Sequence, residues 1–185
     1  MNKRFTIGKF PRTRLRRNRQ SPWCRNLISE TKLSSNDLIL PLFITEGKNI
    51  IENIKSIPSV QRYSVDTVLK KIEEVNNFNI PAIALFPYID KKLKTFDGKE
   101  ALNKNNLICR AIREIKKNFP EIGLICDVAL DPYTTHGHDG ILKKNYIAND
   151  ETIDVLSQQA IIQAEAGADI IAPSDMMDGR IGVIR

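Results

Sequence analysis

The sequence predicts an α/β fold that contains a parallel sheet. Apolar runs of strand length alternate four times with segments of helical periodicity. The apolar runs carry no polar alternation, which is typical of strands in a sheet that helices cover on at least one face. Two architectures fit this pattern: an open doubly wound sheet, and part of a (β/α)8 barrel, of which the chain supplies four of the eight units.

The first unit follows a basic N-terminal segment. Ser21 before Pro22 is typical of a helix start, so a short helix is expected from there towards Glu30. The first strand is expected over residues 38–44. Ser64 is expected to cap the helix that follows, whose inward-facing residues are Val65, Val68, Leu69, Ile72 and Val75.

The second and third strands are expected over residues 80–86 and 123–130. Within the third strand, Cys126 is interpreted as a core residue. Pro120 follows the end of the helix between the two strands. The inward face of that helix is expected to carry Leu107, Ile108, Ala111, Ile112 and Ile115.

The fourth unit contains a long helix and a short strand. Asn149 or Asp150 is expected to cap the helix, and Gly167 is expected to end it. The fourth strand is expected over residues 169–173, and another helix begins near Asp178. The inward-facing residues of the long helix are expected to be Ile153, Leu156, Ala160, Ile161 and Ala164.

Composition limits the class of protein. A chain of 185 residues with 42% hydrophobic and 27% charged residues is typical of one globular domain. No apolar run is long enough to span a membrane, and no secretory signal is visible. The three cysteines are an odd and scattered set, which is typical of a reduced intracellular protein, so a cytoplasmic location is expected.

The net charge of +6 is concentrated near the N-terminus. Aromatic residues are few and do not alternate with these arginines, so we expect no nucleic-acid partner. Residues 1–35 are instead interpreted as an arm that packs on a neighbouring subunit, and residues 36–185 as the barrel-like body; a solvated tail is the alternative for the arm. The arginines concerned are Arg12, Arg14, Arg16, Arg17, Arg19 and Arg25.

An acidic loop follows the third strand. Asp127 and Asp131 are spaced so that an extended backbone would point both to one face, and a turn through Gly137 could return Asp139 to that face. Carboxylates at the end of a core strand usually serve a cation, a base or a substrate amine. Ser174 follows the fourth strand, and in a barrel it would meet the carboxylates at the same rim.

Simpler interpretations of these residues exist. Asp131 before Pro132 and Asp139 before Gly140 are also common turn pairs, and Ser174 could cap the next helix. Asp127 on the same face favours a functional role. The remaining conspicuous residues are assigned to turn hydrogen bonds (His136 and His138), to packing (Met176 and Met177) and to a solvated loop (Lys143 and Lys144).

Residues 127–140 (DVALDPYTTHGHDG) closely resemble the strand-three motif of the porphobilinogen synthase family, also called delta-aminolevulinate dehydratase. Three further stretches resemble the same family in order and spacing: 11–17 (PRTRLRR), 37–43 (DLILPLF) and 168–180 (ADIIAPSDMMDGR). The resemblance covers nearly the whole chain but only about the first half of a family member. It implies the N-terminal half of a (β/α)8 TIM barrel, the first four βα units, preceded by an extended basic arm.

The resemblance also implies a reaction and a metal. Members of the family condense two molecules of 5-aminolevulinate to porphobilinogen with loss of water, through Schiff bases on lysines and with a metal ion. Many members carry zinc-binding cysteines at the positions of Ala129, Asp131 and Asp139. Carboxylates suit magnesium rather than zinc, so Mg²⁺ is the expected cofactor. Asp131 and Asp139 bind either that metal or a substrate amine.

Further roles come from the same resemblance. Asp127 lies beside the Schiff-base lysine and tunes its proton transfers, and Ser174 bonds substrate or orients its loop. Asp178 helps to place an outer magnesium near a subunit interface, and Arg16 of the arm contacts that region. A homo-octamer assembled through the arm is implied.

The lysine motifs of the family, Tyr-Ser-x-Lys and Val-Lys-Pro, do not occur in the chain. We therefore expect these 185 residues alone neither to make porphobilinogen nor to form a stable monomer, because the first and fourth strands would be open edges. The alternatives are a non-catalytic relic or assembly module that pairs with another chain and, less favoured, a basic nucleic-acid-binding protein.

Overall fold

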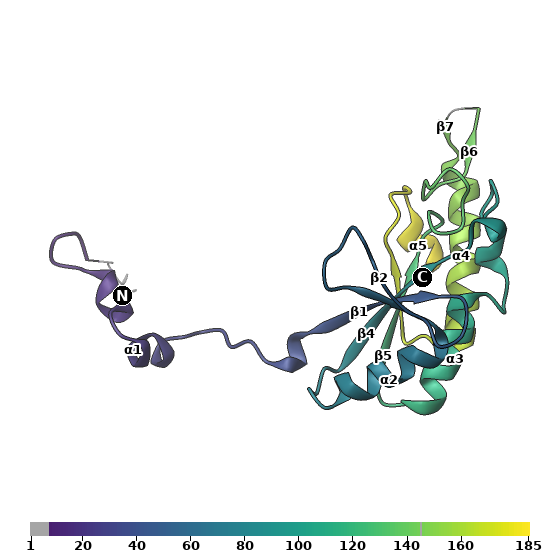
Figure 1. Ribbon diagram of the computed structural model, residues 1–185. Coiled ribbons are helices and arrows are strands. Elements are labelled where there is room, and N and C mark those ends of the chain that lie inside the picture. Colours follow the sequence, from purple (N-terminus) through teal and green to yellow (C-terminus); the bar gives the residue numbers. More distant parts are fainter. Residues whose placement is uncertain (1–7, 145) are drawn as a thin grey trace. The chain divides into compact units, whose positions relative to one another are not determined.

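The computed structural model describes residues 8–144 and 146–185 of the chain. It divides into two compact units, one formed by the residues up to Ser34 and the other by Ser35–Arg185 (Figure 1).

The first unit consists of two short helices. A 3-10 helix, η1 (Leu15–Arg19), precedes α1 (Pro22–Leu27), which begins as predicted but ends before Glu30. The Arg25 guanidinium donates to the backbone oxygen of Arg19 at 3.0 Å. No residue of α1 is buried, so in this unit local hydrogen bonds, rather than an apolar core, accompany the helices.

The second unit is built on a six-stranded sheet, counted over the described residues. Its spatial order is β2-β3-β1-β4-β5-β8. Five of these strands are parallel, and four of the five correspond to the predicted ones: β1 (Ile39–Thr45), β4 (Ala82–Tyr88), β5 (Gly123–Val128) and β8 (Ile170–Pro173). The α/β class with a mainly parallel sheet is therefore confirmed.

These four strands lie side by side in the order in which the chain makes them. Right-handed crossovers between strands added in one direction put every connecting helix on the same face of the sheet. The helices α2 (Val65–Asn76), α3 (Leu107–Asn118) and α4 (Asn149–Ala166) form that layer (Figure 1). A doubly wound sheet reverses its strand order, and the four strands β1, β4, β5 and β8 show no reversal among themselves.

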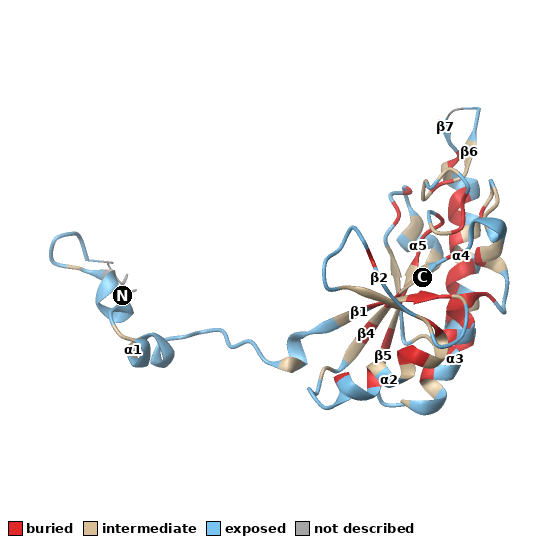
Figure 2. Cartoon of the chain, in the orientation of Figure 1, coloured by how far each residue is buried: buried red, intermediate tan, exposed pale blue. Residues whose placement is uncertain are grey.

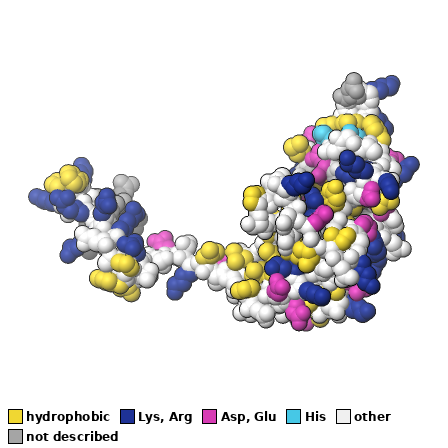
Figure 3. Space-filling model, viewed as in Figure 1, with side chains coloured by type: hydrophobic (Ala, Val, Ile, Leu, Met, Phe, Trp, Pro, Cys, Tyr) yellow, Lys and Arg dark blue, Asp and Glu magenta, His cyan; other side chains and the backbone are white. Residues whose placement is uncertain are grey.

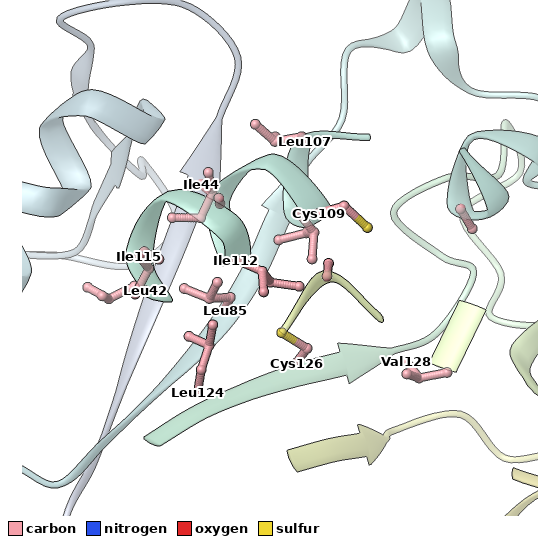
Figure 4. Close-up of a cluster of buried hydrophobic side chains, with 14 of the residues drawn as sticks. Leu42, Ile44, Leu85, Leu107, Cys109, Ile112, Ile115, Leu124, Cys126 and Val128 are labelled. Atoms are coloured by element: carbon pink, nitrogen blue, oxygen red, sulfur yellow. The ribbon is translucent and has the colours of Figure 1, made fainter. Parts of the chain in front are cut away.

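The core lies between the sheet and this helical layer (Figures 2 and 4). Alternate strand residues are buried against the helices: Leu42, Ile44, Ile83, Leu85, Leu124, Cys126 and Val128. The predicted inward face of α3 is confirmed, because all five of its residues are buried. The opposite sheet face is apolar but only half-buried, with the rings of Phe43 and Phe86 5.5 Å apart and Asp127 near its carboxyl edge.

The prediction that the first strand is an open edge is wrong. Strand β3 (Gln61–Tyr63) pairs in parallel with β1, and β2 (Ile51–Asn53) pairs antiparallel with β3. These strands have only three residues each, too few for a periodic pattern to reveal. On the other side, β8 has no further strand beside it within the described residues.

The predicted inward face of α4 is partly wrong. Ile161 is 58% exposed and Ala164 is exposed, whereas Gln159 and Gln163 are buried. The glutamines face the end of β5, where backbone carbonyls need donors that an apolar side chain cannot supply. Gly167 ends the helix at a φ of 114°, as predicted.

The remaining elements are short. They are the 3-10 helices η2 (Ser35–Asp37), η3 (Lys91–Leu93) and η4 (Lys99–Leu102), the hairpin of β6 (Leu142–Lys143) with β7 (Tyr146–Ile147), and α5 (Arg180–Ile184). Among the described residues, no helix combines the length and the apolar character that crossing a membrane requires.

Candidate functional site

The candidate site lies at the carboxyl ends of β5 and β8. Asp127 of β5 is in register with Ala172 of β8. Ser174 directly follows β8, and its backbone N–H donates to the Val128 oxygen at 3.4 Å. Because the two strands are parallel, their following loops begin at the same edge of the sheet.

The chain turns sharply after β5. The N–H groups of Tyr133 and Thr134 both donate to the Leu130 oxygen, at 2.9 and 3.0 Å. The prediction of an extended backbone from Asp127 to Asp131 is therefore wrong, because the strand ends at Val128. The turn leaves Asp131 exposed rather than on the strand.

The two histidines hold the next part of the loop. The Nδ1 atom of His136 accepts from the His138 N–H at 3.1 Å, and Nδ1 of His138 accepts from the Gly140 N–H at 2.9 Å. Gly137 lies between them at a φ of 71°, a left-handed conformation that glycine adopts without a steric penalty. The assignment of both histidines to turn hydrogen bonds is confirmed. Asp139 Oδ1 lies 3.0 Å from His138 Nδ1, a contact that becomes an ion pair when the imidazole is protonated.

These loops enclose a cleft of about 360 Å³. The residues lining it are Asp131, Gly137, His138, Asp139, Ser174 and Met176. The structure thus brings together three of the predicted site residues from two separate loops. Figure 3 shows the histidine side chains beside acidic and basic side chains on one face of this unit.

Asp127 is linked to the cleft through Ser174. Burial raises the pKa of the Asp127 carboxyl above its ordinary value, and a hydrogen bond from the Ser174 side chain opposes that increase. The negative charges of Asp131 and Asp175 raise the pKa further. A carboxyl in this environment holds its proton more readily than an exposed one, which is what a group that exchanges protons near neutral pH requires.

The pKa of Asp131 is also raised. Loss of solvent raises its pKa above the ordinary value, and the charge of Asp139 adds to the increase, while the ammonium of Lys94 opposes it. The two carboxylates that line the cleft therefore repel one another, and a cation between them would relieve that repulsion.

Asp178 is not among the residues that line the cleft. Asp178 is exposed. The Asn149 side chain holds its backbone: it accepts from the Asp178 N–H at 2.8 Å and donates to the Asp178 carbonyl at 3.2 Å. The predicted contact of Arg16 with this region stays a prediction, because the two residues belong to different units.

Three polar residues behind the cleft were not predicted. Asp175 is buried, accepts from the Met177 N–H at 2.7 Å and has Oδ2 3.2 Å from Arg180 Nε. On α4, Gln163 donates to the Asp127 carbonyl at 3.0 Å and Gln159 donates to the Ala129 carbonyl at 3.3 Å. The sequence did contain a signal for the two glutamines: they lie on the helical face that otherwise carries apolar residues, which indicates that they are buried.

The two adjacent methionines differ. Met177 is buried, which confirms its assignment to packing, whereas Met176 is 74% exposed and lines the cleft, so its assignment to packing is wrong. Among the described residues, no group of three or more histidine, cysteine, aspartate or glutamate side chains is gathered as a metal site.

The fold and the cleft place the chain among α/β proteins that carry a polar site at the carboxyl edge of a parallel sheet. A family model described as "Delta-aminolevulinic acid dehydratase" matches residues 12–185, and the chain belongs to that family.

Relatives agree with this assignment. The delta-aminolevulinic acid dehydratase of Bradyrhizobium diazoefficiens is 56% identical over 93% of the chain and 49% of its own length. That of Chlamydia pneumoniae is 51% identical over 98% of the chain and 53% of its own length. A crystal structure of the Toxoplasma gondii enzyme with its reaction product porphobilinogen has a TM-score of 0.90 and 42% identity, over 94% of this chain and 49% of that one. The chain spans about half the length of the curated relatives it matches.

Proposed function

We propose that the chain supplies one half of the active site that condenses two 5-aminolevulinate molecules to porphobilinogen, a lyase reaction of tetrapyrrole and heme biosynthesis. The observation that carries the proposal is the cleft where Asp131, Asp139 and Ser174 meet, close to the partly buried carboxyl of Asp127. In parallel α/β folds this edge of the sheet is where substrates bind. The proposal includes a cytoplasmic location, in keeping with three free cysteines.

In this proposal Asp127 handles protons. Burial raises its pKa, and the interaction with the Ser174 side chain opposes that increase. The condensation releases water and forms Schiff bases, so protons must move to and from amines and carbonyl oxygens. A carboxyl with a raised pKa can both give and accept a proton in such steps, while Ser174 bonds substrate or holds the carboxyl in place.

Asp131 and Asp139 are proposed to bind a positive group, which is either Mg²⁺ or a substrate amine. Magnesium needs few protein ligands because it keeps several waters. Two carboxylates from one cleft therefore fit it. The described residues gather no group of three or more histidine, cysteine, aspartate or glutamate side chains. Bound there, the ion would polarise a substrate oxygen. The proposal does not include zinc, because the cleft offers the carboxylates of Asp131 and Asp139 and no thiolate. The proposal keeps Asp178 as an outer magnesium ligand outside the cleft.

The proposed whole enzyme is larger than this chain. Its sheet closes into a (β/α)8 barrel, which the sequential strand order and the half-buried apolar face support. The segment 1–35 acts as an arm that assembles subunits into a homo-octamer. The Schiff-base lysines come from outside these 185 residues, whose sequence contains neither lysine motif. The alternative is a relic or assembly module with no catalytic partner.

The experiment joins residues 1–185 to the remaining half of the Bradyrhizobium diazoefficiens relative and measures porphobilinogen formed from 5-aminolevulinate. We expect turnover by the joined protein and none by residues 1–185 alone. We also expect a chelator to abolish turnover and magnesium, rather than zinc, to restore it. An inactive but correctly folded joined protein would favour the relic, and restoration only by zinc would contradict the magnesium assignment.

A further inference from the structure

The acidic loop between β5 and α4 is attached to the loop that follows β4. Residues 129–141 belong to no strand or helix, so the regular hydrogen bonds of the fold do not set the positions of Asp131 and Asp139. Thr95 and Thr134 form one parallel bridge between the two loops. The part of the acidic loop beyond this bridge, which carries Asp139, needs a further point of attachment.

His136 supplies that attachment. Its Nε2 atom lies 3.1 Å from the Phe96 carbonyl oxygen, and its Nδ1 atom lies 3.1 Å from the backbone nitrogen of His138. A carbonyl oxygen only accepts and a backbone N–H only donates, so one neutral tautomer, with its proton on Nε2, satisfies both contacts. The His136 ring also meets the Phe96 ring edge to face, with centroids 5.1 Å apart. His136 therefore joins the loop after β4 to the loop that carries the carboxylates.

The anchor at Phe96 is itself fixed. The Thr95 hydroxyl accepts from the Lys99 N–H at 2.9 Å and donates to the Asp97 carboxylate at 2.8 Å. The Thr135 N–H donates to the Thr95 oxygen at 3.0 Å. Because Phe96 lies between Thr95 and Asp97, its carbonyl is a firm point against which the acidic loop can be held.

Further contacts carry the position of His136 on to Asp139. The backbone of His138 is held at its N–H by His136, and its carbonyl accepts from the Thr134 hydroxyl at 2.9 Å. His138 Nδ1 accepts from the Gly140 N–H at 2.9 Å, so both neighbours of Asp139 are held. Asp139 lines the acidic cleft and His136 does not. His136 therefore acts on a ligand in that cleft only through the residues that it positions.

We propose that His136 is a positioning residue for the condensation, because its Nε2–H bond to the Phe96 carbonyl holds the acidic loop with Asp139 and Asp131 in one cleft. The inference rests on the proposed function, in which these two carboxylates bind a positive group. A pair of carboxylates that is already positioned binds its ligand at a lower entropy cost than a pair that the ligand must order.

A purely local role for His136 would need only its other hydrogen bond. The Nδ1 atom accepts from the N–H two residues further along the chain, which is the turn that asparagine side chains also form. The positioning role instead depends on the bond between the two loops, from Nε2 to the Phe96 carbonyl. The two roles therefore require different atoms of the same ring.

Two substitutions separate the two hydrogen bonds. His136→Asn places an oxygen near the position of Nδ1 and keeps the local turn, but its side chain is too short to reach Phe96. His136→Gln places an amide nitrogen near the position of Nε2 and keeps a donor for the Phe96 carbonyl, but it offers no acceptor at the position of Nδ1. Thr135→Val is the control, because Thr135 is exposed and takes part in the junction through its backbone N–H, which valine keeps.

Hydrogen–deuterium exchange of the joined protein, without added metal, measures how firmly the loop is held. We expect the amides of residues 139–143 to exchange about five- to tenfold faster in His136→Asn, as expected for the loss of one hydrogen bond. The same amides should stay within about twofold of the wild type in His136→Gln and in Thr135→Val.

Turnover of 5-aminolevulinate by the same proteins measures the consequence for the reaction. We expect kcat/KM to fall about tenfold in His136→Asn, to recover to within about threefold of the wild type in His136→Gln, and to stay unchanged in Thr135→Val. Equal losses in the two His136 variants, or a larger loss in His136→Gln, would overturn the proposal. A loss in Thr135→Val as large as that in His136→Asn would overturn it as well.

The exchange measurement separates this inference from the proposed function. If the joined wild type makes no porphobilinogen but the loop loosens in His136→Asn alone, the attachment is supported and the proposed function fails. If the wild type is active and the loop loosens in His136→Asn without a loss of kcat/KM, the positioning role fails and the proposed function stands. An unchanged exchange rate in His136→Asn would overturn the attachment itself.

Discussion

Asp127 joins the packed sheet to the cleft. It is partly buried on the half-covered sheet face, its backbone carbonyl accepts from Gln163 at 3.0 Å, and interaction with the Ser174 side chain lowers the pKa of its carboxyl. Burial favours the protonated form of the carboxyl, while the hydrogen bond favours the ionised form. The balance between these two effects sets the pH range in which Asp127 can exchange a proton.

The Ser174→Ala variant tests this balance. Removing the hydroxyl removes the hydrogen bond that lowers the Asp127 pKa, so the pKa should rise further above its ordinary value. The measurement is the pH titration of the Asp127 carboxyl carbon by NMR. Ser157→Ala is the control, because the Ser157 hydroxyl donates to the Asp154 backbone oxygen on α4. A pKa that stays constant or falls in Ser174→Ala would contradict the assigned hydrogen bond.

At the scale of elements, α4 positions the end of β5 with polar rather than apolar contacts. Gln159 and Gln163 are buried and donate to the carbonyls of Ala129 and Asp127. The pairing of β5 with β4 ends at Cys126, and β5 itself ends at Val128, so these carbonyls lie where regular sheet pairing stops. The glutamines therefore fix the backbone from which the acidic loop departs.

Gln163→Met tests this role of α4. Methionine has a similar size but no donor, so the Asp127 carbonyl loses a buried hydrogen bond, and we expect a loss of about 1–2 kcal/mol in the free energy of unfolding. Gln158→Met is the matched control on the same helix, since Gln158 is exposed, and it should change stability by less than about 0.5 kcal/mol. Urea unfolding of the joined protein at one protein concentration measures both; equal effects would disprove the positioning role.

The sequence predicts the regular elements well because their periodicity reflects burial. The inward face of α3 and the start of α1 follow the expected pattern. The polar positions of α4 escaped prediction because a buried glutamine looks like a surface residue when its carbonyl partner is unknown. The place of Asp131 in the cleft depends on a turn after Val128, and the burial of the Asp175 carboxylate depends on the nearby Arg180 guanidinium. Both follow from local turns and contacts rather than from periodicity.

For the molecule as a whole, the parallel sheet has one well-covered face and one partly covered face. The helices cover Leu42, Leu85 and their neighbours, whereas Phe43, Phe86 and Ile125 on the opposite face are only half-buried. In the proposed barrel this second face packs into the interior. Strand β8 also offers an edge with no strand beside it among the described residues.

Residues 1–185 alone should therefore self-associate. An apolar face together with an unpaired strand edge favours pairing between chains. Sedimentation velocity over a range of protein concentrations should show concentration-dependent oligomers. Joining the second half should remove the association that occurs through the β8 edge. A monodisperse monomer that melts cooperatively would contradict this expectation.

The most direct measurement is the rate of porphobilinogen formation by the joined protein carrying Asp127→Asn, compared with the same protein carrying Asp154→Asn. Asp154 is an exposed carboxylate on α4, away from the cleft residues. If Asp127 handles protons in the reaction, Asp127→Asn lowers kcat by about 10²- to 10⁴-fold and Asp154→Asn leaves it unchanged. Full activity in a folded Asp127→Asn protein would contradict the account.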